Sequence, residues 1–555
     1  MCRGVRVILL LAAGLLCGDV SAVQFAYIVK FTDKNNTPFS LTSPLAYLSS
    51  RSIDRRTSQG IAIDSTDLPV NTAYLDSVIT LTGGKMHGTS RWINSCVVLL
   101  PDTNAIHALN GKPYIHSYKR IAFYTDSLHR PLPADTNGRQ AAKTTAGGSA
   151  HYGNTWNQTA RVKGDILHDD GYTGNGKLIA VFDAGFIDAD THVGFSSMWS
   201  SGRVLDKYNF TLATDFIFGY DTHGAKALST MAGYIPGTYV GSAPAASYAL
   251  YITEDGNSEQ PIELVNMLFA CERADSLGAD IITTSLGYNT FDNVTDNFVF
   301  ATDFDGKTTI AAKAANTAVT KGILFVASAG NEGGGGWNMI LTPGDADSAL
   351  TIGSVDVSGA NAPNSGFGPN AAGRVKPDVC AMGQGAALLI GSSGFINQNG
   401  TSYSTPQVAG WAACLWQAYP TATPFQIRQA IIRCASSFAT PGAQIGYGIP
   451  DFSCSHQLML SIPDTPPPFS PATWVAAAPN PFSDKITLIV APDTEQRVQF
   501  TITDMAGREV YSDNAFFNKG FNDPISISIA GLPSGIYMLR AVSPTEQQVL
   551  KLVKQ

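Results

Sequence analysis

The chain has few charged residues, no basic block and no metal-binding motif, and each absence excludes a class of protein. Only 14% of its 555 residues are charged and 44% are hydrophobic, which is typical of a folded rather than a disordered protein. The net charge of −8 is spread along the chain, so nothing favours nucleic-acid binding. The sequence contains no CxxC or HExxH pattern, which argues against a metalloenzyme.

Long apolar runs are also missing, and the one short run is typical of an export signal. Two arginines precede the apolar run 7–17, and small residues ending at Ala22 provide a cleavage site. A membrane-spanning helix needs about 18 apolar residues, and no run reaches that length. Lipoprotein processing at Cys17 is the alternative, although Leu16 stands where a small residue is expected. We therefore expect residues 1–22 to be removed during secretion.

Eight cysteines in a chain of this length do not form a dense disulfide framework. Cys380 and Cys414 lie in apolar stretches and are expected to be buried thiols. Export permits disulfides, and Cys434 with Cys454 is the pair to test first.

Composition and periodicity divide the rest of the chain into five segments. Residues 23–130 have an α+β pattern, and residues 131–150 have the Ala-, Gly-, Thr- and Pro-rich composition of a linker. Residues 151–461 alternate short apolar strands with helices, which predicts an α/β fold with a doubly wound, mostly parallel sheet. A Pro-rich spacer, 462–471, precedes alternating short strands in 472–555 that indicate a small β-sandwich.

The central segment contains four residues that could carry acyl-transfer chemistry. Asp183 follows the predicted strand 178–182, and His223 begins a helical run. Asn331 closes an apolar strand, and Ser402 opens an apolar helix. An attacking hydroxyl needs a base, a carboxylate that orients the base, and donors for the oxyanion, and these four residues supply those groups in a workable order.

Each of these residues has an ordinary structural explanation when it is considered alone. Aspartate after a strand commonly forms a turn, and a histidine at a helix start commonly packs in the core. His192 is the nearest rival to His223, but it lies in a polar loop, whereas a general base must be held rigidly. The combination in one chain order is therefore the informative observation.

The central segment resembles the subtilisin-like serine peptidases, whose reacting residues follow the order Asp, His, Ser. The matching words are VFDAG at 181–185, DTHG at 221–224, SLG at 285–287, AGN at 329–331 and GTS at 400–402, with GRVKPDV at 373–379 in support. The resemblance implies a subtilisin-like α/β fold and a serine endopeptidase that hydrolyses proteins through an acyl-enzyme on Ser402. It makes Asp183 and His223 the other triad members and Asn331 the oxyanion donor.

The resemblance also predicts which residues border the substrate cleft. They belong to two strand ends and comprise Ser285, Leu286, Gly287, Ser328, Ala329 and Gly330; strand-end packing is the alternative explanation. The chain departs from the family pattern at Ala184, Ala225, Tyr288 and Tyr403, the last of which stands where the family commonly has methionine. These departures remove no reacting group, but they make substrate preference inherited from relatives uncertain.

The flanking segments have resemblances of their own. The words SRSIDRR at 50–56 and SRWIN at 90–94 are similar to the prosegment of secreted bacterial subtilases, which would assist folding and inhibit the enzyme. A permanent accessory domain is the alternative. PNPF at 479–482 and the end KLVKQ resemble the C-terminal sorting domain of the type IX secretion system, and a β-sandwich that binds sugar or protein is the alternative.

These resemblances predict the partners and exclude a required cofactor. Polypeptide substrates, the chain's own prosegment and the type IX secretion machinery are the expected partners, with export through the Sec route. The chemistry requires no cofactor, and structural calcium is frequent in such peptidases, but no spaced carboxylate loop assigns its ligands. A catalytically silent surface protein and an esterase are the competing functions, and the latter lacks its G-x-S-x-G motif around Ser402.

Overall fold

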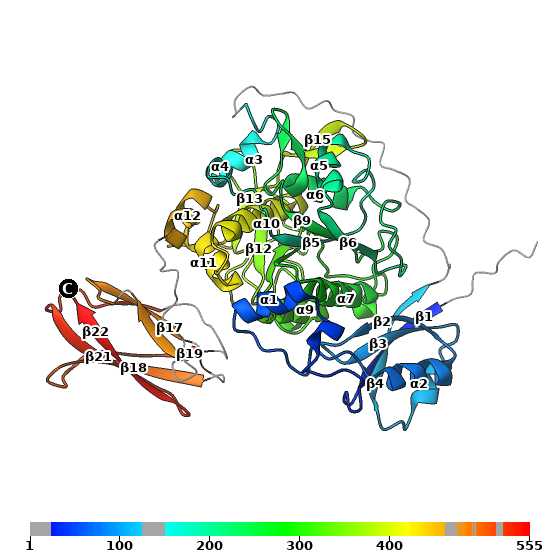
Figure 1. Cartoon of the computed structure of the whole chain (residues 1–555), viewed down its shortest axis with the longest axis horizontal. Coiled ribbons are helices and arrows are strands. Elements are labelled where there is room, and N and C mark those ends of the chain that lie inside the picture. Colours follow the sequence, from blue (N-terminus) through cyan, green and yellow to red (C-terminus); the bar gives the residue numbers. More distant parts are fainter. Residues whose placement is uncertain are drawn as a thin grey trace, which may run out of the picture. The chain divides into compact units, whose positions relative to one another are not determined.

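The computed structural model describes residues 24–124, 150–460, 474–478, 480–490, 492, 496–517 and 525–555 (Figure 1). The predicted signal peptide 1–22, the linker 131–150 apart from its last residue, and the spacer 462–471 lie outside them. Two compact units are present, Met1–Met459 and Leu460–Gln555. Among the described residues, no helix combines the length and hydrophobicity that crossing a membrane requires.

A seven-stranded sheet forms the centre of the first unit, and all its neighbouring strands pair in parallel. Its order is β13 (Val379–Met382), β12 (Leu350–Val355), β11 (Leu324–Ser328), β10 (Ile281–Thr284), β5 (Leu178–Asp183), β9 (Ser247–Ile252) and β6 (Val204–Asn209). This confirms the predicted parallel α/β sheet. The apolar runs 178–182, 247–252, 281–285, 323–327 and 350–354, which predict strands, correspond to β5, β9, β10, β11 and β12. The strands β6, at an edge of the sheet and with charged residues, and β13 were not predicted.

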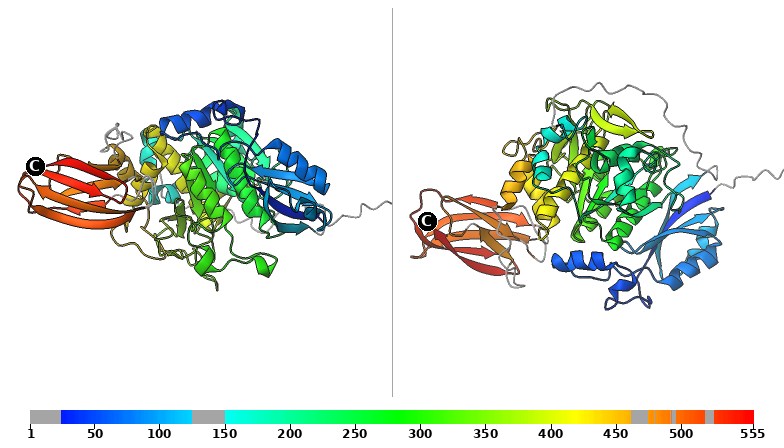
Figure 2. Two further views of the ribbon diagram at one scale, coloured as in Figure 1. Left: turned by 90° about the horizontal axis from the view of Figure 1, so that it is seen from below. Right: turned by 45° about the horizontal axis from the view of Figure 1, so that its top comes forward.

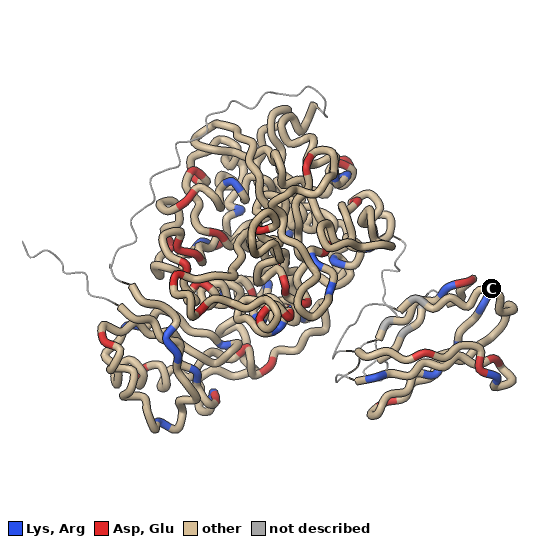
Figure 3. Tube along the Cα trace, turned by 180° about the vertical axis from the view of Figure 1, so that it is seen from behind, with Lys and Arg blue, Asp and Glu red and all other residues tan. Residues whose placement is uncertain are grey.

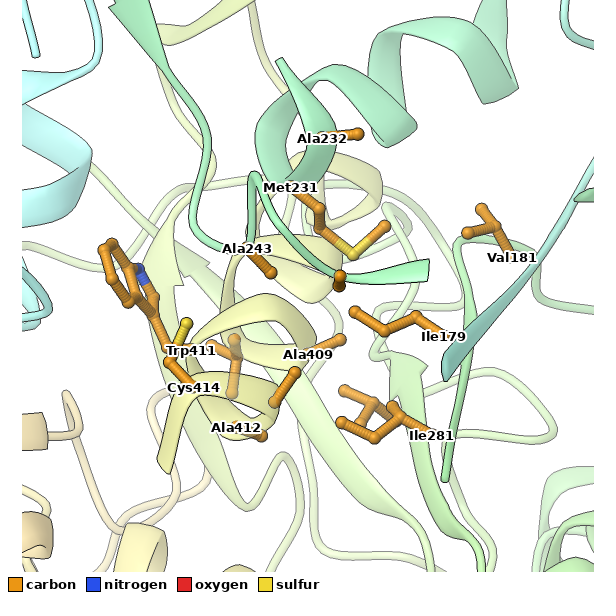
Figure 4. Close-up of a cluster of buried hydrophobic side chains, with 14 of the residues drawn as sticks. Ile179, Val181, Met231, Ala232, Ala243, Ile281, Ala409, Trp411, Ala412 and Cys414 are labelled. Carbon is orange, nitrogen blue, oxygen red and sulfur yellow. The ribbon is translucent and has the colours of Figure 1, made fainter. Parts of the chain in front are cut away.

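Helices cover both faces of this sheet. Successive side chains of a strand point to opposite faces, so β5 has apolar side chains to bury on each face. On one face, α6 (His223–Ala232) and α10 (Thr401–Ala418) pack against Ile179 and Val181. Figure 4 shows Met231 of α6 and Ala409 of α10 next to Ile179 and Ile281. On the other face, α7 (Ile262–Leu277) and α9 (Ile310–Thr320) join a cluster that contains the remaining apolar side chains of β5.

Shorter elements complete the first unit. They are α3 (Trp156–Arg161), α4 (Asp165–Asp169), α5 (Ser196–Ser200), α8 (Phe300–Asp303), α11 (Pro424–Arg433), α12 (Phe452–Leu460) and the hairpins β7 (Tyr234–Ile235) with β8 (Tyr239–Val240) and β14 (Ala386–Ile390) with β15 (Gly394–Gln398). A disulfide joins Cys434, at the end of α11, to Cys454 in α12, which is the pair that the sequence analysis put first for testing. Cys380 and Cys414 are buried free thiols, which also agrees with the sequence analysis.

Residues 24–124 form the N-terminal domain, an antiparallel sheet with two main helices. The sheet order is β2 (Lys85–Ser90), β3 (Ser95–Leu100), β1 (Gln24–Phe31) and β4 (Ile115–Tyr124), and the helices are α1 (Ser50–Ser58) and α2 (Thr72–Thr82). α1 and β2 contact α7 of the central domain (Figure 1, Figure 2). The N-terminal domain therefore covers the helical layer formed by α7 and α9.

Buried charges connect the two domains. Asp275 of α7 is fully buried, and its carboxylate lies 2.5 Å from Arg55, 2.6 Å from Arg56 and 2.5 Å from Arg91. One turn earlier, Glu272 accepts hydrogen bonds from the Ser90 hydroxyl and the Arg91 backbone N–H. Acidic and basic segments lie side by side where the N-terminal domain meets the central domain (Figure 3). Because these arginines all come from the N-terminal domain, its docking provides the partners of Asp275 and Glu272 of α7.

The second unit is a β-sandwich of two antiparallel sheets, as predicted. One sheet has the order β16 (Val475–Ala478), β17 (Lys485–Val490), β20 (Ile525–Ser528), and the other has β19 (Glu509–Phe517), β18 (Gln496–Asp504), β21 (Gly535–Val542), β22 (Gln547–Lys554). Hydrogen bonds join the start of this unit to its end. Asn480 bonds to the Lys551 carbonyl and the Val553 N–H, and Phe482 exchanges backbone hydrogen bonds with Val553 and Gln555.

We expect Asp275→Ala to reduce the free energy of unfolding by about 3–5 kcal/mol, because it leaves three buried arginines without their shared carboxylate. The measurement is urea unfolding of the full chain carrying Ser402→Ala, which prevents any self-cleavage. Asp215→Ala is the control, because Asp215 pairs with Lys207 at the surface, where a salt bridge contributes about 0–1 kcal/mol. Equal unfolding midpoints for the two variants would contradict the expectation.

Candidate active site

Asp183 lies at the carboxyl end of β5, in the middle of the parallel sheet. Side chains beyond this edge commonly form the ligand or catalytic site of such sheets. The carboxylate is fully buried, and its Oδ1 accepts hydrogen bonds from the Ala184 N–H at 2.8 Å and from His223 Nδ1 at 2.7 Å. The structure therefore brings together the predicted carboxylate and the predicted base.

His223 is the first residue of α6, as the sequence analysis expected. Its backbone N–H donates to Asp221 Oδ1 at 2.6 Å, which fixes the start of the helix. The Nδ1–H donates to Asp183, so Nε2 of the neutral imidazole is left as an acceptor. The side chain is 30% exposed, so a substrate can reach it.

Two glycines allow this approach of helix to strand. A Cβ on Gly224 would lie 2.4 Å from the Gly185 carbonyl oxygen and 2.8 Å from the Asp183 Cβ. A Cβ on Gly185 would lie 2.3 Å from the Asp221 N–H nitrogen. The loops that carry Asp183 and His223 thus pack backbone against backbone, which only glycine permits.

Ser402 lies in the first turn of α10, and it is largely buried. Its hydroxyl donates to the Ser285 carbonyl at 3.3 Å, and the Ser285 hydroxyl donates to the Ser402 carbonyl at 2.9 Å. The Ser402 carbonyl can accept this bond because its helical partner four residues later is Pro406, which has no N–H. This reciprocal pair joins the start of α10 to the end of β10.

Asn331 follows β11 and contacts the same helix start. Its Oδ1 accepts from the Thr401 N–H at 2.9 Å and from the Thr401 hydroxyl at 3.1 Å. Since a backbone N–H can only donate, these bonds fix the carboxamide oxygen and leave its NH₂ group available to donate elsewhere. The Ser402 N–H, in the first turn of α10, likewise has no helical acceptor. The Asn331 NH₂ group and the Ser402 N–H are therefore the two candidate donors for an oxyanion.

The segments predicted to border the cleft also lie together. Ser285–Leu286–Gly287 follows β10 and Ser328–Ala329–Gly330 ends β11, and the Ser328 hydroxyl donates to the Leu286 carbonyl at 3.2 Å. Gly287 and Gly330 both pack against Leu341, so a side chain at either position would collide with it. These strand ends follow the same sheet edge as Asp183.

His192 is separate from this site. It is 2% exposed, its Nδ1 accepts from the Gly194 N–H, and its Nε2 lies 3.1 Å from the Gly394 carbonyl. Through the Gly394 carbonyl it contacts the β14–β15 hairpin.

Sequence reasoning missed two groups that contact the predicted residues. Asp221 accepts a hydrogen bond from the His223 N–H in an Asx turn, and its position two residues before the helix start is a recognisable signal. Tyr403 lies with its ring centroid 5.8 Å from that of His223, and no sequence signal indicated this contact. Within the described part of the chain, no three His, Cys, Asp or Glu side chains are arranged to hold a metal ion.

Charge around His223 favours its protonated form. Burial alone would lower the pKa, but the Asp183 charge and hydrogen bond, with Asp221 and Glu254 further away, raise the pKa of His223 to about 9. Burial, together with the nearby Glu259 and Asp183 charges, raises the pKa of Glu254 to about 8. The site therefore stabilises an imidazolium, which is the species a general base becomes.

Three families match successive parts of the chain. The Subtilase family matches residues 174–449, the Peptidase S8 propeptide domain of Bacteroidota matches residues 26–141, and the secretion system C-terminal sorting domain matches residues 477–555. Subtilisin NAT of Bacillus subtilis subsp. natto is 27% identical over 382 residues, which cover 68% of this chain and 84% of that protein. Subtilisin of Bacillus pumilus is 29% identical over 292 residues, 52% of this chain and 93% of its own length.

We expect kcat/KM for peptide hydrolysis to rise with pH through a limb well above 6.5, because only neutral His223 can accept a proton. Asp221→Asn keeps an oxygen for the His223 N–H but removes a negative charge that favours the imidazolium. This variant should therefore shift the limb to lower pH. Asp215→Asn, an exposed charge earlier in the same loop, is the control. A limb at the same pH in all three proteins would contradict this electrostatic account.

Proposed function

The chain is a subtilase with a propeptide domain and a secretion sorting domain, and we propose that Ser402, His223 and Asp183 carry out its peptide-bond hydrolysis. It is a secreted serine endopeptidase. The observation that supports this assignment most strongly is the 2.7 Å hydrogen bond from His223 Nδ1 to buried Asp183, at the sheet edge where the first turn of α10 carries Ser402.

The reaction begins with a proton transfer from Ser402. Its hydroxyl turns from the Ser285 carbonyl toward Nε2 of His223, which takes the proton as the oxygen attacks the peptide carbonyl. Asp183 holds the tautomer and stabilises the resulting imidazolium. His223 then returns the proton to the departing amine, and water, activated by the same imidazole, releases the acyl group from Ser402.

Asn331 and the Ser402 N–H stabilise the oxyanion of the tetrahedral intermediate. The Asn331 NH₂ group is available because its oxygen is committed to Thr401, and the Ser402 N–H lies at the positive end of α10. Both donors are fixed before the reaction, so no reorganisation is needed as the charge develops.

Polypeptides are the substrates, and we assign the cleft borders to the two strand ends. Residues 285–287 and 328–330 follow neighbouring strands of the sheet, and the former contact Ser402 directly. A substrate lying between them would reach the Ser402 hydroxyl with its backbone. Structural calcium stays a prediction without assigned ligands.

The propeptide and sorting domains indicate inhibition by the chain's own prosegment and delivery by a secretion machinery. We propose that the prosegment, residues 23–130, blocks the cleft of the catalytic domain, residues 151–461, until the connecting linker is cut. The last strand of the N-terminal domain, β4, supports this proposal. The backbone of Phe123 in β4 and the side chain of Gln260 exchange two hydrogen bonds, and Gln260 lies in the loop that follows β9 of the catalytic domain. The type IX secretion machinery would recognise residues 472–555 as the sorting domain.

Ser402→Ala should abolish casein cleavage and labelling by a fluorophosphonate probe while the chain still folds, because no other group supplies the nucleophile. Ser404→Ala is the matched control: Ser404 is buried two residues later, and its hydroxyl bonds only within α10, to the Thr401 carbonyl. Labelling of the Ser402→Ala protein, or equal loss in both variants, would refute Ser402 as the nucleophile.

Asn331→Leu should reduce kcat by about 10²–10³ with little change in KM, the loss known for the corresponding donor in subtilisin itself. The variant also removes the acceptor for the Thr401 N–H. Asn331→Asp separates the two effects, because it keeps that acceptor and replaces the NH₂ donor by oxygen. Recovery of activity in Asn331→Asp would show that helix capping, not oxyanion stabilisation, is the role of Asn331.

A further inference from the structure

Tyr403 presents its ring to the imidazole of His223. The two ring centroids lie 5.8 Å apart with an interplanar angle of 39°. Tyr403 directly follows Ser402 in α10, so the same helical turn carries the nucleophile and this aromatic neighbour of its base. The subtilase pattern commonly has methionine at this position, so the contact is a property of this chain.

The ring of Tyr403 is held firmly in place. Its hydroxyl donates to Gln398 Oε1 at 2.7 Å, and the residue is 5% exposed. The ring packs in a small apolar cluster with Ala386, Leu388 and Ile396 of the β14–β15 hairpin. A ring anchored at its hydroxyl and along its edge cannot turn away when His223 changes its charge.

Tyr403 stays neutral while His223 titrates. Burial, with the nearby charges of Asp183 and Asp221, raises the pKa of the Tyr403 hydroxyl. The charged or titratable groups facing His223 are Asp183 at the end of β5, Asp221 before α6, and Glu254 after β9. Tyr403 adds a neutral π face from α10, and a π face within about 6 Å attracts a cation.

We propose that Tyr403 is a positioning residue, which holds the His223 imidazole against Asp183 and stabilises the imidazolium formed when Ser402 gives up its proton. The proposal rests on the proposed function of Ser402 and His223. At a pH above the limb the resting base is neutral and the imidazolium exists only in the transition state, so the contact should act there on kcat more than on KM. It also makes the hairpin β14–β15 a support for catalysis although the hairpin contributes no reacting group.

The test replaces Tyr403 by phenylalanine and then by mono-, di- and trifluorinated phenylalanines, which keep the ring shape and progressively remove electron density from its face. Tyr403→Phe should stay within about threefold of wild type, since the ring remains. Along the fluorinated series, kcat should fall progressively to about five- to thirtyfold below Tyr403→Phe, and the acid limb of kcat/KM should move to lower pH. Tyr403→Met, of similar volume but without a π face, should match the most fluorinated variant.

Two controls separate the possible failures. Ile396→Val trims the same cluster without touching the His223 ring and should leave the pH limb unchanged. Fluorophosphonate labelling of the wild-type protein at Ser402 reports the underlying mechanism independently, so its absence would refute the proposed function and not the role of Tyr403 alone. With labelling intact, equal kcat and an equal pH limb across the fluorinated series would overturn the proposal.

Discussion

The site depends on one buried hydrogen bond, from His223 Nδ1 to Asp183 Oδ1. It fixes the imidazole tautomer, and hence leaves Nε2 as the nitrogen that can accept a proton. The bond is possible only because the loops that follow β5 and precede α6 approach through Gly185 and Gly224 without side chains between them. Burying a carboxylate away from water costs free energy unless it is paired, so burial of Asp183 favours its hydrogen bond with His223.

α10 is the second element that the chemistry needs, because it carries Ser402 and Tyr403 on one rigid body. The helix runs through the core, and its first sixteen residues are buried. Its first turn departs from regular helical hydrogen bonding. Because Pro406 has no N–H, the Ser402 carbonyl accepts from the Ser285 hydroxyl, and the Thr401 N–H donates to the Asn331 side chain. Polar contacts at one end and apolar packing along its length therefore hold Ser402, the proposed nucleophile, in a fixed position, as acyl transfer requires.

Much of this architecture could be predicted from local signals. Fully buried parallel strands such as β5 are continuous apolar runs, so a polar residue at the end of such a run, like Asp183, or shortly after it, like Asn331, could be found. Contacts between segments that are far apart in the sequence could not be predicted from such local signals. Nothing in the sequence relates Tyr403 to the ring of His223, or three arginines of the N-terminal domain to Asp275, because these contacts depend on how helices pack. The edge strand β6 was not predicted, because its charged residues interrupt the apolar pattern that indicates a strand.

The pairing of β22 has a consequence for the edge of the β-sandwich. β22 pairs with β21 along the whole length of both strands, and Gln555 donates to the Phe482 carbonyl near the start of the unit. Without β22, β21 would be an open sheet edge, which invites aggregation. A proteolytic cut within β22 would therefore expose backbone groups of β21, so the intact strand protects the sandwich from edge-to-edge association.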